Sequence, residues 1–319
     1  MVKHQPAQES RNQNAPSRWA DRKYRHLKIV LAGVVFLLAL GLTLYPVVSN
    51  AYNQKHQSMI QTAYEEDLRQ VDTSDLERIR ELAEAYNRSI VPGTAGEAYS
   101  QAALLSAAED YDAQLDPSGS GIMGYIEIPK ISVNLPIYHG SDEETLERGT
   151  GHLLGSSLPV GGESTHSVIT GHSGMASQKM FTDLEQLEQG DVFYLRVLDE
   201  ILAYQVEAIH TVLPHDASLL GIVPGEDLCT LVTCTPTGVN THRLLVTGSR
   251  IPYTEPEITE KETEEPEVIA SHWEDQYVVG LLFGMIAVLA LALILLTAIQ
   301  LYRTIHKPKR RKAGKYVKK

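Results

Sequence analysis

Two long runs without a charged residue constrain this chain more than any other feature of its sequence. Residues 29–48 and 277–301 contain no Asp, Glu, Lys or Arg. A helix of about 20 apolar residues is long enough to cross the hydrocarbon core of a bilayer. Both runs are therefore predicted to be transmembrane helices. For the first run the alternative is a cleaved signal peptide, because Ser49-Asn50-Ala51 resembles a small-residue cleavage site.

Positive charge flanks both runs. The tail at 1–28 holds seven Lys and Arg against two acidic residues, and the stretch 303–319 holds nine against none. Because Lys and Arg accumulate on the cytoplasmic side, the tails at 1–28 and 302–319 are predicted to be cytoplasmic and the middle of the chain extracellular. Residues 29–302 carry 12 basic and 38 acidic residues, and so negative a region would repel a phosphate backbone. We expect no nucleic-acid partner.

The extracellular region divides by composition. Residues 51–115 are predicted to be helical, with Ser74 and Glu77 as a capping box and a second helix over 97–110. From residue 122 to 253 the pattern favours short strands in a closed barrel or a sandwich. Residues 254–276 form an acidic linker to the second span. Strands are predicted at 124–131, 133–138, 167–170, 191–198, 202–213, 228–235 and 243–251, and short helices at 143–148 and 181–187.

The two cysteines lie five residues apart in one predicted strand. Alternation along a strand directs Cys229 and Cys234 to opposite faces, so a disulfide between them is geometrically poor. Cys229 is most simply a small buried residue. Cys234 ends the strand beside a loop, where active-site groups are common, although it could be buried as well. A reactive cysteine must be a thiolate, which requires a cationic neighbour.

Two residues could supply that neighbour. His172 lies between glycines in Gly171-His172-Ser173-Gly174, just after a predicted strand. Arg243 opens the next strand nine residues after Cys234, close enough for adjacent antiparallel strands to bring guanidinium and sulfur together. The other candidate histidines are less suitable: His242 should face away from Arg243, and His152 and His166 are expected to be structural. His139, His152 and the acids at 142–144 lack metal-site spacing, so no metal or cofactor is expected.

Taken together, these segments resemble the sortase transpeptidases of Gram-positive bacteria. The resemblance covers residues 121–253, including the motifs at 124–131, 156–162, 230–234 and 240–246. Two membrane spans make the chain similar to class C, the pilin-polymerising sortases. The resemblance implies an eight-stranded β-barrel with an N-terminal helical extension, flanked by two transmembrane helices. It also implies that Cys234 is the nucleophile, His172 the acid and base, and Arg243 the electrostatic stabiliser.

The resemblance further implies a reaction. Such an enzyme cleaves a Leu-Pro-x-Thr-Gly-like sorting signal between Thr and Gly and joins the acyl group to a lysine amine of another pilin subunit. One alternative is a housekeeping-type sortase that attaches surface proteins to peptidoglycan. Another is a non-catalytic binding module on a sortase-like barrel. The expected partners are therefore pilins or surface proteins that carry the signal, and the membrane.

One segment departs from the family pattern. Class C enzymes often have a lid in which Asp-Pro precedes an aromatic residue, whereas this chain has Asp116-Pro117-Ser118. Asp116 could still reach Arg243, but Ser118 has no ring to shield the cysteine sulfur. We expect residues 116–121 to form a loose, mobile lid, or an ordinary turn before the first strand.

Overall fold

The computed structural model describes residues 18–90, 111–175 and 177–254, with five isolated positions at 284–286, 288 and 297. The chain divides into two units, Met1–Tyr45 with Gly280–Lys319, and Pro46–Val279. The second unit holds the barrel. The predicted helix over 97–110 and the linker lie outside the described residues, and so does the second span apart from the isolated positions.

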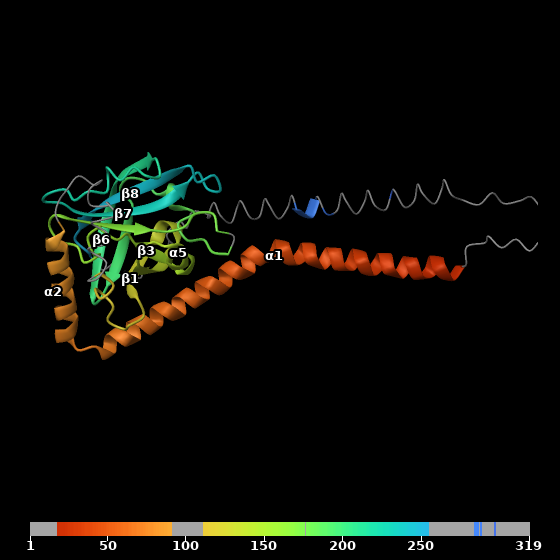
Figure 1. The fold of residues 1–319 in the computed structure, drawn as a ribbon, viewed down its shortest axis with the longest axis horizontal. Helices are drawn as coiled ribbons and strands as arrows, with labels where there is room; N and C mark the ends of the chain where they lie inside the picture. Colours follow the sequence, from red (N-terminus) through yellow and green to blue (C-terminus); the bar gives the residue numbers. More distant parts are fainter. Residues whose placement is uncertain are drawn as a thin grey trace, which may run out of the picture. The chain divides into compact units, whose positions relative to one another are not determined.

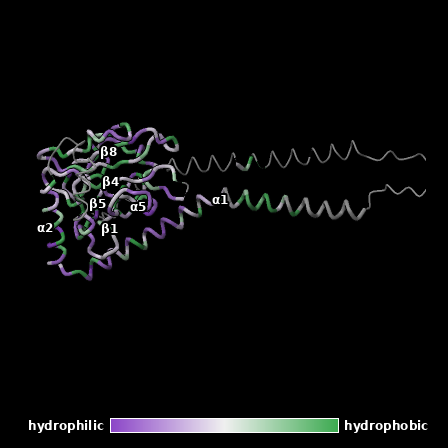
Figure 2. Tube along the Cα trace, in the orientation of Figure 1, coloured by the Kyte–Doolittle hydropathy of each residue, from purple (hydrophilic) through white to green (hydrophobic). Residues whose placement is uncertain are grey.

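Helix α1, Arg18–Gln70, is a single helix of 53 residues. Its apolar stretch lies within residues 29–48, and the part from residue 53 to Gln70 is largely hydrophilic, a change that the coloured part of α1 in Figure 2 shows. By length and composition alone, the stretch from Ala32 onward could cross a membrane, with a mean hydropathy of 2.1 in its most apolar window. The expected apolar N-terminal helix is confirmed. It continues without a break through residues 49–51, where we expected the extension to begin as a separate element.

Helix α2, Thr73–Ser89, packs against the barrel. Its N-cap residue is Asp72 rather than Ser74, so the predicted capping box is wrong. The helix begins two residues earlier than that motif indicated. Leu76 and Ala83 join the main hydrophobic core. At the other end, the Asn87 amide donates to Leu158 O (3.1 Å) and accepts from Leu158 N (2.7 Å), which fixes the helix to the barrel.

The remainder of this unit is a closed barrel of eight strands in the order β1-β2-β3-β4-β7-β8-β6-β5 (Figure 1). The pairs β2–β3 and β4–β7 are parallel, and the others are antiparallel. Parallel neighbours need a crossover, which explains the irregular connections in the sequence. The strands are β1 Ile122–Ile128, β2 Val133–His139, β3 Thr150–His152, β4 Thr165–Thr170, β5 Val192–Val197, β6 Glu200–Val212, β7 Asp227–Thr235 and β8 His242–Ile251.

The barrel confirms most of the predicted elements. Helix α5 spans Glu143–Arg148, as predicted. Strand β1 ends at Ile128, three residues earlier than expected, because Pro129 begins a 3-10 turn, Pro129–Ile131. The segment predicted as a helix over 181–187 contains only the 3-10 turn Leu184–Gln186. No pattern in the sequence predicts β3, which has three residues.

Alternation along the strands separates an inner core from an outer apolar cluster. The inward side chains of β7 include Cys229 and Leu231, which belong to the main core. The outward side chains Val168, Val232 and Leu245 pack with Leu220 from the connection between β6 and β7. The barrel is therefore covered at this face by its own loop.

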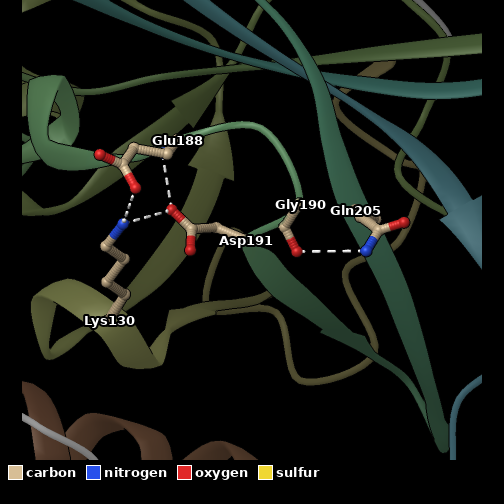
Figure 3. Close-up of polar contacts among 5 residues, drawn as sticks. All are labelled: Lys130, Glu188, Gly190, Asp191 and Gln205. Atoms are coloured by element: carbon tan, nitrogen blue, oxygen red, sulfur yellow. Dashed lines mark hydrogen bonds and ion pairs between the residues drawn. The ribbon is translucent and has the colours of Figure 1, made fainter.

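A polar network closes the seam between β1 and β5. The Lys130 ammonium, in the turn after β1, lies 2.8 Å from Asp191 Oδ2 and 3.4 Å from Glu188 Oε2 (Figure 3). Beside it, the Gln205 amide on β6 donates to Gly190 O at 3.1 Å. The side chains of Lys130 and Asp191 are both mostly shielded from solvent, so this pair is held more firmly than the exposed ion pairs.

Candidate active site

Strand register brings the three predicted residues to one end of the barrel. Cys234 on β7 pairs directly with Arg243 on β8, and opposed residues of an antiparallel pair share a face. On the other side of β7, Thr170 of β4 pairs with Val232. Two hydrogen bonds extend this alignment beyond β4, from Gly171 N to Val232 O (3.0 Å) and from Thr233 Oγ1 to Gly171 O (2.7 Å). The next residue, His172, is thereby brought to the level of Cys234.

The loops that follow β4 and β7 are joined to each other. Ser173 Oγ and Thr237 Oγ1 are 2.8 Å apart, a hydrogen bond between the residue after His172 and the loop after Cys234. The backbone oxygen of His172 also accepts from Phe181 N at 3.0 Å. These contacts hold the histidine loop against the cysteine strand.

Steric crowding explains why glycine precedes His172. A Cβ added at Gly171 would lie 2.7 Å from ring atom Cδ2 of Phe181, which is fully buried. At Gly174, φ is +76° and a Cβ would lie 2.8 Å from Thr237 Cγ2. Glycine at both positions allows the loop to lie close to these side chains.

The functional groups share a face without contacting one another directly. Cys234 is a free, half-buried thiol. The Arg243 guanidinium donates to the backbone oxygens of His242 (3.1 Å) and Asn240 (3.4 Å). Within the described residues, no hydrogen bond joins the Cys234 thiol to His172 or Arg243. Such contacts often form only when substrate is bound.

The second cysteine has no role in this site. Cys229 is fully buried in the main core and is a free thiol, so the expectation of no disulfide is confirmed. Burial raises the pKa of the Cys229 thiol well above its ordinary value. Only Cys234 among the two is accessible at the strand end.

Two further histidines, His152 and His166, are buried and hydrogen-bonded within the fold. His152 lies fully buried between Tyr111 Oη (2.9 Å) and Ser157 O (2.8 Å), and burial lowers the pKa of His152 to about 4. Burial also lowers the pKa of His166, whose ring contacts Gly221 O and Thr230 Oγ1. Both agree with the structural role predicted for them.

Residues 116–121 form a turn before β1. Asp116 Oδ1 accepts from Gly121 N at 3.0 Å, and the hydroxyls of Ser118 and Ser120 are 2.7 Å apart. Asp116 does not reach Arg243 in this structure, although the sequence left that contact open, and both side chains bond to nearby backbone instead. The local turn satisfies the carboxylate at a much smaller cost in chain entropy.

His139 connects both ends of this turn to β2. Its Nδ1 lies 3.2 Å from Gly121 O, and its Nε2 lies 2.6 Å from Gln114 O. The edge of the ring packs against Tyr111, with centroids 5.1 Å apart. The sequence identified His139 only as a poor metal ligand, because neither carbonyl could be placed beside it.

A further polar neighbour of His172 comes from α5. Glu143 Oε1 lies 3.9 Å from His172 Nε2. Helix α5 directly precedes β3, and β3 pairs with β4, the strand that leads to His172. Because β3 had no sequence signal, this proximity could not be predicted.

Comparison with known proteins identifies the fold family. The sortase domain family matches residues 126–251. Sortase D of Bacillus subtilis is 30% identical over 142 residues, which cover 44% of this chain and 69% of that protein. The chain belongs to the sortase family. Sortase A of Streptococcus agalactiae is 28% identical over 140 residues, and the match spans only 56% of its length.

The solved structures that this sortase matches include several of class C. Sortase C of Streptococcus pneumoniae is 42% identical, with a TM-score of 0.55, over 62% of this chain and 99% of that one. Sortase C1 of Streptococcus agalactiae is also 42% identical, with a TM-score of 0.56, over 61% and 100% of the two chains. Sortase C-1 of Actinomyces oris is 45% identical, with a TM-score of 0.51, over 56% and 99%. The resemblance to class C is confirmed.

Proposed function

We propose that this sortase is a cysteine transpeptidase that builds pili. The observation that carries the proposal is the register that sets Cys234 opposite Arg243 and brings His172 to the same level of β7. A thiol, an imidazole and a guanidinium on one face are the groups that thioester chemistry needs: a nucleophile, a proton carrier and a cation for the developing oxyanion.

The first half of the proposed reaction forms a thioester. The Cys234 thiolate attacks the Thr carbonyl carbon of a Leu-Pro-x-Thr-Gly-like signal, while Arg243 stabilises the negative oxygen. To do so, the guanidinium must release the backbone oxygens of its own loop. The His172 imidazolium then gives its proton to the Gly nitrogen as the C–N bond breaks.

The second half transfers the acyl group. Neutral His172 takes a proton from an incoming lysine amine, whose nitrogen attacks the thioester carbonyl. The C–S bond breaks, an isopeptide bond forms and the Cys234 thiolate is restored. The acceptor is a lysine of another pilin subunit.

One comparison supports the choice of substrate. The sortase C of Streptococcus pneumoniae that matches this chain is described in terms of pilin substrate specificity.

The proposed setting is the outer face of a cell membrane. The apolar part of α1 would anchor the N-terminus, and the run 277–301 would be the second span. By the positive-inside rule, the basic tails favour a cytoplasmic location for both termini and an extracellular location for the barrel.

The test is mass spectrometry of the full-length protein in detergent. It is incubated with a Leu-Pro-x-Thr-Gly peptide, with and without a pilin fragment that carries a lysine. We expect an acyl adduct on Cys234 and its transfer to the lysine. An adduct that passes only to a cell-wall cross-bridge amine would favour the housekeeping function, and no adduct at all would favour a binding module.

The two cysteines provide a matched pair of variants. Cys234→Ala should abolish adduct and polymer, because no other accessible thiol lies on this face. Cys229→Ala should keep activity, since that side chain only fills core volume. Polymerisation by Cys234→Ala would overturn the assignment of the nucleophile.

A further inference from the structure

Glu143 holds a carboxylate beside the proposed proton carrier. Its Oε1 is 3.9 Å from His172 Nε2, yet the two side chains differ in accessibility: 82% of the glutamate is exposed, against 23% of the histidine. The carboxylate is therefore the more accessible of the two groups to a molecule that arrives from solvent.

The position of Glu143 is fixed by the start of α5. Asp142 caps the helix, with Oδ1 accepting from Thr145 N (3.0 Å) and Oδ2 from Thr145 Oγ1 (2.9 Å). Thr145 Oγ1 also lies 3.4 Å from His139 O at the end of β2. Glu143 is the first residue after this cap, so its backbone is anchored although its side chain is exposed.

The charge of Glu143 is not neutralised by a neighbour. Among the described side chains, no Lys or Arg forms an ion pair with it, and the one basic group within 4.0 Å of it is the His172 imidazole. The basic residue of α5, Arg148, lies 4.4 Å above the ring of Tyr138 instead. The carboxylate is therefore available to a cation from outside the chain.

The proposed second half-reaction requires such a cation. A lysine side chain has an ordinary pKa of about 10.4, so the acceptor arrives as an ammonium and must be deprotonated before it attacks. The geometry points to Glu143 as the acceptor-binding residue, which holds the lysine ammonium of the incoming subunit beside His172. This inference rests on the proposed function and adds to it the group that selects a charged amine.

The proton balance is as follows. The bound ammonium gives one proton to neutral His172 and becomes a nucleophilic amine. The amine forms the isopeptide bond, the C–S bond breaks, and the second proton of the nitrogen leaves to water. The site returns to thiolate and imidazolium, and Glu143 takes no part in the proton transfer.

The experiment compares two nucleophiles on one acyl-enzyme. Full-length protein in detergent is first acylated with the Leu-Pro-x-Thr-Gly peptide, and the adduct is then chased with a lysine-bearing pilin peptide or with hydroxylamine, which is uncharged at neutral pH. For Glu143→Gln we expect about a threefold rise in KM for the lysine peptide at low salt, the size of a solvent-exposed ion pair. The rise should shrink at high salt, and acylation and the hydroxylamine chase should be unchanged.

Glu144→Gln and Glu147→Gln are the matched controls, because both side chains are exposed on the same helix and neither contacts His172. They should react like the parent enzyme. Equal effects of all three variants would show that the KM depends on the overall negative charge of α5 and not on Glu143 in particular, which would overturn the inference. So would an unchanged KM for Glu143→Gln, or an equal loss with both nucleophiles. Failure to form any acyl-enzyme would instead count against the proposed function.

Discussion

At the scale of single residues, the site depends on how closely the histidine loop approaches its neighbours. Gly171 leaves room for the ring of Phe181, and the Ser173–Thr237 hydrogen bond joins the loop to the cysteine side. These four residues have no proposed part in the chemistry, yet they determine where the His172 imidazole lies. A small displacement of the loop would separate His172 from Cys234.

We expect Gly171→Ala to destabilise the protein by about 1–3 kcal/mol, the usual cost of overpacking a core. The new methyl would meet the Phe181 ring, which is fully buried and cannot withdraw. The measurement is the thermal midpoint together with the rate of thioester formation. The double variant Gly171→Ala with Phe181→Leu should recover part of both losses. A double variant as impaired as the sum of the single variants would show that this contact is not the cause.

At the scale of elements, the shortest strand separates what the sequence could predict from what it could not. The pairing of Cys234 with Arg243 was predictable, because Arg243 follows Cys234 by only nine positions and the two lie on adjacent antiparallel strands. Strand β3 is only Thr150-Gly151-His152, too short for an alternating pattern. Without β3, α5 could not be placed beside β4, so the proximity of Glu143 to His172 could not be predicted from the sequence. The predicted cap of α2 is wrong for a different reason: Asp72 and Ser74 are both suitable N-cap residues, and the sequence does not distinguish them.

His139 anchors a second element, the turn at 116–121. Replacing it by Leu removes the contacts to Gln114 O and Gly121 O while keeping an apolar side chain against Tyr111. We expect faster amide hydrogen exchange in residues 115–121 of His139→Leu, with β7 and β8 unchanged. Unaltered exchange in the turn would mean that Asp116 and the serine pair hold it without the histidine.

At the scale of the whole molecule, two buried histidines make stability depend on pH. The pKa of His152 is about 4 in the folded protein against 6.5 for an ordinary histidine. Between these values the unfolded chain binds a proton that the folded one does not, so stability is complete above pH 6.5 and is lost as pH falls through this window. His166, whose pKa is also lowered by burial, contributes in the same direction.

We therefore expect the thermal midpoint to decrease as the pH is lowered from 7 to 5. His152 alone should account for a loss of about 2 kcal/mol in the free energy of unfolding. The variant His152→Gln should be less stable at pH 7, because Gln fits the contacts to Tyr111 and Ser157 poorly, but its stability should change less with pH. The pH dependence that remains would belong mainly to His166. A slope equal to that of the parent protein would show that His152 does not titrate in this way.

The parallel pairing of β4 with β7 also determines when the proposed site is completed during folding. The residues that it joins, Gly171 and Thr233, are 62 positions apart, and the strands between them belong to the far side of the barrel. Before that pairing forms, Cys234 can have Arg243 of its own hairpin opposite it, but it has no His172 at its level. A newly made chain would thus pass through synthesis and export without its proposed proton carrier in place, and the proposed site would be complete only once the barrel has closed.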